Sequence, residues 1–212
     1  MELKLKKNKN YSGRPGPLLF VIMDGIGIGK QDEGDAVFRA HTPELDKLMK
    51  LPLYCRLKAH GPAVGLPGEG DMGNSEVGHN AFGAGRVFAQ GAKLVDISIR
   101  SGRIFKSDTW KKMMQKGHEG GTVHFIGLLS DGNVHSHIDH LFAMINRCAE
   151  ENIKKVRIHI LLDGRDVDKQ TALEYIKPLE ELLAGLNHRK DVDYAIASGG
   201  GRMITTMDRY KA

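Results

Sequence analysis

Three short apolar runs in the second half of the chain limit the possible folds more than any other feature. They cover residues 123–129, 156–162 and 192–197, and each has the length and apolar content of a buried strand. The stretches between them, 137–150 and 171–184, repeat apolar residues at the three- and four-residue spacing of an amphipathic helix. Strands and helices that alternate in this way predict an α/β fold with a mainly parallel sheet covered by helices.

Polar residues gather directly after each predicted strand, in the segments 131–137, 163–166 and 198–202. In open α/β sheets, ligands bind beyond the carboxyl ends of the strands. Three polar segments at three such ends therefore predict a binding site formed by all of them.

The first part of the chain contains further predicted elements. An apolar run at 17–23, closed by Asp24, predicts a strand that is buried on both faces. Thr42, which precedes a proline, predicts the N-cap of a helix. Segment 61–73 is rich in glycine and proline and is predicted to be a loop, which leads to Ser75 at the start of a short helix.

Composition narrows the range of partners. A net charge of +5 and a pI near 9.1 suit an anion such as nucleic acid, an acidic lipid or a small phosphorylated metabolite. Five basic residues lie in the first 14, where a short basic tail is usually solvated, and no zinc spacing supports nucleic-acid binding. No apolar run reaches the roughly 20 residues that span a bilayer, and the two distant cysteines fit reduced thiols. We therefore predict a cytoplasmic protein that binds neither nucleic acid nor a membrane.

Ser75 and Asp24 are candidates for catalysis with a metal. The glycines around Ser75 let the backbone approach a phosphate, and a helix start stabilises its negative charge. A serine hydroxyl is a weak nucleophile until a base or a metal lowers its pKa, and no histidine spacing here suggests a Ser-His-Asp triad. Asp24, at the end of a strand, could bind a divalent metal. In the alternative interpretation, Ser75 is a turn or cap residue and Asp24 caps the following turn.

The polar segments after the predicted strands contain candidates for binding an anionic substrate. His135 and His137 could pair on a metal, bind substrate or cap a helix. Arg165 could clamp a phosphate or carboxylate, and Asp166 could act as a general acid or base, although the two could also form a local ion pair. Two further arginines follow the glycine-rich end of the third strand and suit an anion: Arg202 and Arg209.

Five motifs together resemble the cofactor-independent phosphoglycerate mutases, which do not need 2,3-bisphosphoglycerate. They occur in the order of that family and with similar spacing: VIMDGIG at 21–27, GDMGNSEVGHNAFGAGR at 70–86, LLSDGNVHSHIDHL at 128–141, LLDGRD at 161–166 and SGGGRMITTMDRY at 198–210. The resemblance implies an alkaline-phosphatase-like domain interrupted by an inserted α/β phosphotransferase domain. Residues 1–89 would begin the first domain and residues 90–212 the second, with the boundary where glycine-rich turns give way to an amphipathic pattern.

The resemblance also implies a mechanism that interconverts 3-phosphoglycerate and 2-phosphoglycerate in glycolysis. Ser75 would take the phosphoryl group as phosphoserine, the glycerate would reorient, and the group would return to the other hydroxyl. Asp24 and Ser75 would share one divalent ion, Mn²⁺ or else Mg²⁺ or Co²⁺. Asp166 would deprotonate and reprotonate the glycerate. The implied substrate-binding residues are His135, Arg165, Asp166, Arg202 and Arg209.

Length is the main departure from that family, whose members are well over twice as long. The resemblance implies that a C-terminal half, with most of the metal ligands, is the missing partner of this chain. We therefore expect the 212 residues to be inactive alone. Two alternatives are a non-catalytic product that binds an anionic metabolite or a protein partner, and a related metal-dependent phosphatase or phosphomutase.

Overall fold

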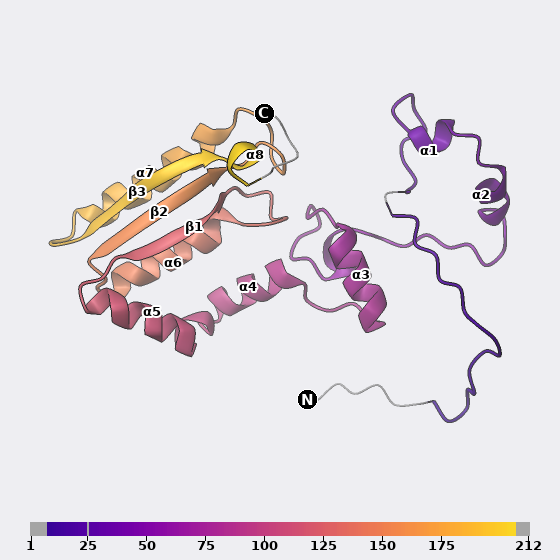
Figure 1. Cartoon of the computed structure of the whole chain (residues 1–212), viewed down its shortest axis with the longest axis horizontal. Helices are drawn as coiled ribbons and strands as arrows, with labels where there is room; N and C mark the ends of the chain where they lie inside the picture. The colour runs from indigo at the N-terminus through magenta and orange to yellow at the C-terminus, as the bar shows by residue number, and fades with distance from the viewer. Residues whose placement is uncertain (1–7, 25, 207–212) are drawn as a thin grey trace. The chain divides into compact units, whose positions relative to one another are not determined.

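The computed structural model describes residues 8–24 and 26–206, and these fall into two compact units (Figure 1). The division lies between Arg56 and Leu57. The positions of the two units relative to one another are not determined. The domain boundary predicted near residue 90 falls inside the second unit and stays a prediction.

The second unit is built on a parallel sheet (Figure 1). Its described strands are β1 (Val123–Leu129), β2 (Lys155–Leu162) and β3 (Asp193–Gly201), in that spatial order. Two crossover helices connect them, α6 (Ile138–Glu150) and α7 (Ala172–Asn187). The predicted α/β class, the parallel sheet and the alternation of strands and helices are therefore confirmed.

Helices cover one face of this sheet. Ile145 on α6 and Leu179 on α7 are both fully buried, in the same core as Ile158 of β2. The helix α5 (Asp108–His118) adds Trp110 to that core. On the opposite face of β1, Ile126 is 79% exposed, so the predicted buried strand is buried only on the face that the helices cover. Parallel crossovers are almost always right-handed, and two successive crossovers in one direction place both helices on the same face.

Helix α7 is not interrupted by Pro178 in its interior. The proline leaves the carbonyl of Glu174 without its helical donor, and Glu174 is an exposed residue. Within the described residues, no helix has the length and apolar character needed to cross a bilayer.

Shorter elements precede and follow the sheet. They are α4 (Gly91–Arg100), the 3₁₀ helix η2 (Ile104–Lys106) and α8 (Arg202–Thr205).

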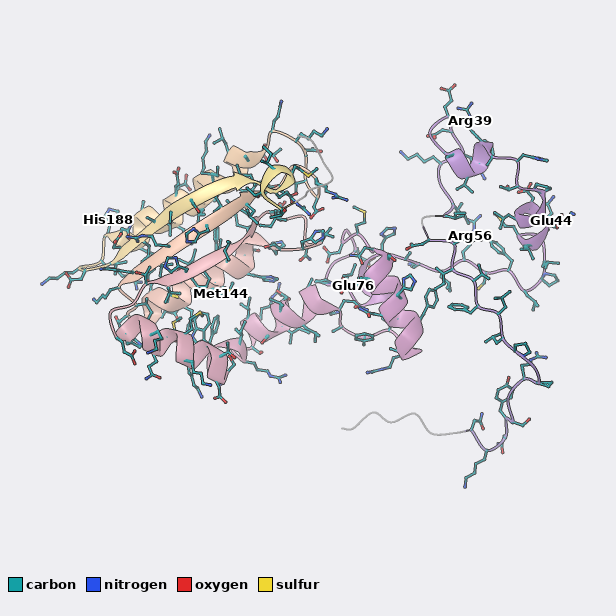
Figure 2. All side chains as sticks on the ribbon, viewed as in Figure 1. Arg39, Glu44, Arg56, Glu76, Met144 and His188 are labelled. Atoms are coloured by element: carbon teal, nitrogen blue, oxygen red, sulfur yellow. The ribbon has the colours of Figure 1, made fainter. Side chains whose placement is uncertain are left out.

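The segment that carries Ser75 has a small core of its own, formed by Val64, Leu66 and Val77. It contains the 3₁₀ helix η1 (Gly61–Val64) and α3 (Ser75–Ala84), whose first turn includes the labelled Glu76 (Figure 2). Ser75 therefore begins a helix, as predicted. The loop before it needs glycine at position 73, since an added Cβ would lie 1.8 Å from the carbonyl oxygen of Ala59.

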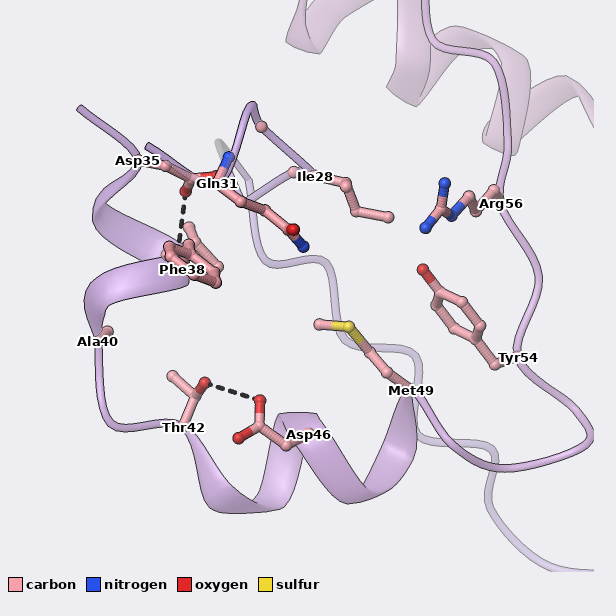
Figure 3. Close-up of a pocket in the computed structure, with 13 residues that line it drawn as sticks. Ile28, Gln31, Asp35, Phe38, Ala40, Thr42, Asp46, Met49, Tyr54 and Arg56 are labelled. Atoms are coloured by element: carbon pink, nitrogen blue, oxygen red, sulfur yellow. Dashed lines mark hydrogen bonds between the residues drawn. The ribbon is translucent and has the colours of Figure 1, made fainter. Parts of the chain in front are cut away.

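The first unit contains α1 (Ala36–Arg39) and α2 (Pro43–Leu48). Helix α2 begins after Thr42 as predicted, but the Thr42 hydroxyl donates to the Asp46 carboxylate instead of capping the backbone (Figure 3). A cavity of about 400 Å³ lies beside these two helices, and Figure 3 shows the residues that line it.

The predicted buried strand at 17–23 is wrong. The segment is not a strand, and Leu18 and Phe20 are 87% and 64% exposed. A strand that is buried on both faces needs neighbouring strands and covering helices. The described part of this unit contains no other strand with which the segment could pair.

Candidate active site

The three polar segments that follow the strands meet at one edge of the sheet (Figure 1). His135 follows β1, Asp163 and Asp166 follow β2, and Arg202 follows β3 at the start of α8. Parallel strands end at the same edge, which is why Asp163 and Arg202 come into contact although they lie 39 positions apart in the chain.

Asp163 lies at the centre of this group, with a side chain only 1% exposed. Its Oδ1 accepts three hydrogen bonds, from the backbone N–H groups of Arg165 (3.0 Å) and Asp166 (3.1 Å) and from Nη1 of Arg202 (2.9 Å). Burial raises the pKa of the Asp163 carboxyl, but these bonds and the nearby Ser130 hydroxyl outweigh it and lower that pKa.

Arg202 joins the two carboxylates of the group. Its Nη1 also donates to Oδ2 of Asp166 at 2.8 Å, and each of these two side chains is 9% exposed. Burial lowers the pKa of the Arg202 guanidinium, but the hydrogen bonds to Asp166 and Asp163 more than reverse that effect, so the pKa is raised. The charge of Arg202 is therefore permanent, and it compensates two carboxylates that would otherwise be buried unpaired.

His135 completes the group from the exposed side. Its Nδ1 lies 2.7 Å from Oδ2 of Asp166, and its side chain is 57% exposed. A contact this short between a ring nitrogen and a carboxylate oxygen needs a proton between the two atoms. The same Asp166 oxygen thus receives a cation on its buried side and an imidazole on its open side, which suits a group that exchanges protons with a ligand.

These contacts leave donors for an anion. Arg202 uses Nη1 for both carboxylates, and none of its other nitrogens donates to a described residue. Arg165 is exposed in the same turn. Arg209 lies outside the described residues, so its predicted role stays a prediction. A guanidinium and an imidazole that contact the same carboxylate, as Arg202 and His135 do, can bind a phosphate or carboxylate.

Ser75 has a histidine neighbour that the sequence analysis did not anticipate. The Ser75 oxygen lies 3.1 Å from Nδ1 of His79, one helical turn further on, and the same nitrogen lies 2.8 Å from the Ser75 carbonyl oxygen. A carbonyl can only accept, so Nδ1 carries the proton and cannot remove one from the serine. In the described part of the chain, no carboxylate contacts His79, so a Ser-His-Asp triad is not formed.

One contact links the loop before Ser75 to the histidine segment after β1. Asn133 Nδ2 donates to Oδ1 of Asp71 at 3.1 Å, and the other Asp71 oxygen accepts the backbone N–H of Gly68 at 2.8 Å. Asn133 has a positive φ of 56°, which asparagine tolerates better than most residues. The loop that leads to Ser75 is thus anchored to the segment that carries His135.

The predicted metal pair is divided between the two units. Asp24 is exposed in the first unit and Ser75 begins α3 in the second, so the structure does not test a shared ion. Among residues 8–24 and 26–206, no group of three or more His, Cys, Asp or Glu side chains could hold a metal. The ion shared by Asp24 and Ser75 therefore stays a prediction.

Two residues of the site were missed by sequence reasoning. Asp163 was assigned no role, although an aspartate that opens a turn commonly accepts backbone N–H groups two or three residues later. His79 was overlooked, although a residue four positions after a helical serine lies on the same face of the helix.

Comparison with known proteins decides the family. A family model described as "BPG-independent PGAM N-terminus" matches residues 95–212. The chain belongs to the 2,3-bisphosphoglycerate-independent phosphoglycerate mutase family. The resemblance drawn from the five motifs is thereby confirmed, and so is the implied independence of 2,3-bisphosphoglycerate as a property of the family.

Relatives with this name occur in distant organisms. A probable mutase of Leptospira interrogans is 47% identical over 98% of the chain, and the mutase of Trypanosoma brucei is 48% identical over 100% of it. The structure also matches a crystal structure of Leishmania mexicana phosphoglycerate mutase. That match has a TM-score of 0.80 and 48% identity over 90% of the chain, and it confirms the predicted fold class.

The chain spans little more than a third of the length of these relatives. It covers 38% of the Leptospira and Trypanosoma proteins and 35% of the Leishmania chain. The activity of the whole enzyme is therefore a separate question from the membership of this chain in the family.

Proposed function

We propose that this chain supplies the nucleophile and part of the substrate site of an enzyme that interconverts 3-phosphoglycerate and 2-phosphoglycerate. The observation that carries the proposal is the group at the strand ends, in which Arg202 is held by Asp163 and Asp166 and His135 contacts Asp166. It unites cationic donors with a proton-exchanging carboxylate, as transfer of a phosphoryl group between two hydroxyls requires.

In the proposed reaction, Ser75 attacks the phosphorus of the substrate. The Ser75 hydroxyl releases its proton to solvent, its oxygen bonds to phosphorus, and the bond from phosphorus to the glycerate oxygen breaks. The proton that His135 and Asp166 share passes from Asp166 to that glycerate oxygen. After the glycerate turns, its other hydroxyl returns a proton to Asp166 and its oxygen attacks the phosphoserine. The bond from phosphorus to the seryl oxygen breaks, and that oxygen takes up a proton from solvent, which restores Ser75.

The positions of the two substrate anions follow from the charges. Arg202 and Arg165 provide guanidinium groups for the carboxylate or phosphate, and His135 holds the proton that it shares with Asp166. Arg209 is proposed to add a further guanidinium. These residues bind and orient the glycerate while the phosphoryl group remains on Ser75.

A divalent ion is part of the proposal, although the described residues do not provide a complete site for it. Bound beside Asp24 and Ser75, a metal would favour ionisation of the serine hydroxyl. Manganese, magnesium and cobalt are all candidates, and the Leishmania structure was determined at low cobalt concentration. Further ligands would have to come from beyond these residues, as we propose for the C-terminal half. A cytoplasmic location likewise stays a prediction.

A chimera tests this function directly. The 212 residues replace the matching part of the Trypanosoma brucei relative, which is 48% identical. With 3-phosphoglycerate and Mn²⁺, ³¹P NMR should show 2-phosphoglycerate for the chimera and none for its Ser75→Ala variant. A folded chimera without turnover, or a Ser75→Ala variant that retains it, would reject the proposal.

A second function is favoured by the lack of a three-ligand metal group among the described residues. The chain alone would then bind an anionic metabolite without turning it over. Calorimetry with 3-phosphoglycerate, with and without Mn²⁺, should show binding to the 212-residue chain that does not depend on the metal. Binding that requires Mn²⁺ would count against this second function.

A further inference from the structure

One carboxylate oxygen contacts three described residues that are proposed to bind the substrate after β2 and β3. Oδ1 of Asp163 accepts the N–H groups of Arg165 and Asp166 and the Nη1 donor of Arg202, all within 3.1 Å. The Asp163 side chain is 1% exposed, so it is out of reach of a ligand.

We propose that Asp163 is a positioning residue, which sets the turn at 163–166 and the guanidinium of Arg202 in one fixed arrangement. The inference rests on the proposed function, because it concerns the same substrate site. Asp163 acts through its neighbours: the two backbone bonds fix the direction of the Asp166 side chain, and the bond to Nη1 fixes Arg202 against it.

The negative charge of Asp163 is essential to this arrangement. Nη1 of Arg202 carries two N–H bonds and donates to both carboxylates, so the attraction of both charges sets the position of the guanidinium. With a neutral amide at position 163, Asp166 alone would attract Arg202. Oδ2 of Asp166 would then turn from His135 toward the guanidinium, and the anion donors would lose their common orientation.

The surroundings of the second Asp163 oxygen also bear on a neutral replacement. Oδ2 is buried and has no hydrogen bond of good geometry, although the buried Ser130 hydroxyl lies close enough to contribute to lowering the pKa of the carboxyl. An Asp163→Asn side chain would place an NH₂ group at one of these positions. There it would either face the N–H groups of the turn or lie beside Ser130, whose hydroxyl oxygen could accept only one of its two hydrogens while it also accepts the N–H of Gly132.

The test compares Asp163→Asn with Asp168→Asn, which changes an exposed carboxylate in the same loop. Amide hydrogen exchange by NMR reports the backbone bonds, and the chemical shifts of the 212-residue chain during addition of 3-phosphoglycerate report affinity. In Asp163→Asn, the Arg165 and Asp166 amides should exchange about tenfold faster and the affinity should fall about tenfold or more. Asp168→Asn should change neither.

The outcomes separate positioning from a general effect on stability. Exchange at Ile158, in the buried part of β2, reports global unfolding and should stay within about twofold of the original chain. If Asp163→Asn accelerates exchange equally at all three amides, or leaves the affinity unchanged, the inference is wrong. If that variant does not fold, the unmodified chain still tests the inference, because its Arg165 and Asp166 amides should exchange about tenfold more slowly than that of Lys169.

Failure of the proposed function gives a different result. The unmodified chain and Asp168→Asn would then show no shift changes with 3-phosphoglycerate, whereas the exchange of the Arg165 and Asp166 amides would still depend on Asp163. Inorganic phosphate serves as a second probe. A response to inorganic phosphate alone would indicate a general anion site and would overturn the role of Asp163 in binding phosphoglycerate.

Discussion

Replacement of Arg202 by methionine tests the electrostatic design of the site. The change removes a buried guanidinium that lies 2.9 Å from Asp163 and 2.8 Å from Asp166, whose side chains are 1% and 9% exposed. Removal of one partner from a buried ion pair costs about 3–5 kcal/mol, because the other charge stays buried without compensation. At about 2–4 °C per kcal/mol for a domain of this size, the melting temperature should fall by roughly 10 °C.

Urea unfolding followed by circular dichroism measures this change. Arg103→Met is the matched control, since Arg103 is exposed in the same unit, and it should change the free energy of unfolding by less than about 0.5 kcal/mol. The double variant Asp163→Asn/Arg202→Met should recover part of the lost free energy of unfolding, because the buried carboxylate at position 163 is then absent.

The dependence on pH has a definite sign. The pKa of Asp163 is lowered from 3.8 in the folded state. Its stabilising contribution is therefore present above pH 3.8 and is lost as the pH falls through the lower folded-state value. The difference in free energy of unfolding between the original chain and Arg202→Met should be largest near neutral pH and should become smaller under acid conditions. An Arg202→Met chain with unchanged stability at pH 7 would refute the assignment of a buried ion-pair group.

Three further predictions concern neighbouring parts of the second unit. Gly73→Ala should destabilise the unit by roughly 1–3 kcal/mol in urea unfolding, since its Cβ would meet the Ala59 carbonyl at 1.8 Å; unchanged stability would contradict this packing. Burial and the Asp131 hydrogen bond raise the pKa of Tyr175 to about 12, so Asp131→Asn should move its ultraviolet titration toward 10, and an unmoved titration would exclude that bond. Asn133→Ala should lower the free energy of unfolding by about 1–2 kcal/mol, and Asn133→Gly should lower it by less, because the φ of 56° at this position suits glycine better than alanine. Equal losses in urea unfolding would argue against a positive φ there.

The sheet could be predicted from sequence because its determinants are local. Each strand is a short apolar run, and each crossover helix is long enough to show its periodicity, so the order β1-β2-β3 follows from chain order and short connections. The start of α3 at Ser75 was also predictable, since Asn74 caps the helix by accepting the N–H of Val77.

Interactions between distant segments could not be predicted from local sequence patterns. The run at 17–23 has the composition of a buried strand, but burial depends on partners that local composition does not reveal. The role of Asp163 depends on Arg202, which lies 39 positions away and is brought close only by the pairing of β2 and β3. The exposure of one face of the sheet likewise depends on the handedness of the crossovers, because that handedness places both helices on the other face. The pattern of apolar residues does not encode it.

The central claim is that Ser75 accepts the phosphoryl group of phosphoglycerate, and a trapped intermediate tests it most directly. The chimera is mixed with 3-phosphoglycerate, quenched in acid within its first turnovers, digested and analysed by mass spectrometry. The account predicts that the peptide containing Ser75 gains the mass of one phosphoryl group, and that the Ser75→Ala variant gains none. An active chimera whose Ser75 peptide stays unmodified, or whose phosphoryl group appears on another residue, would contradict it.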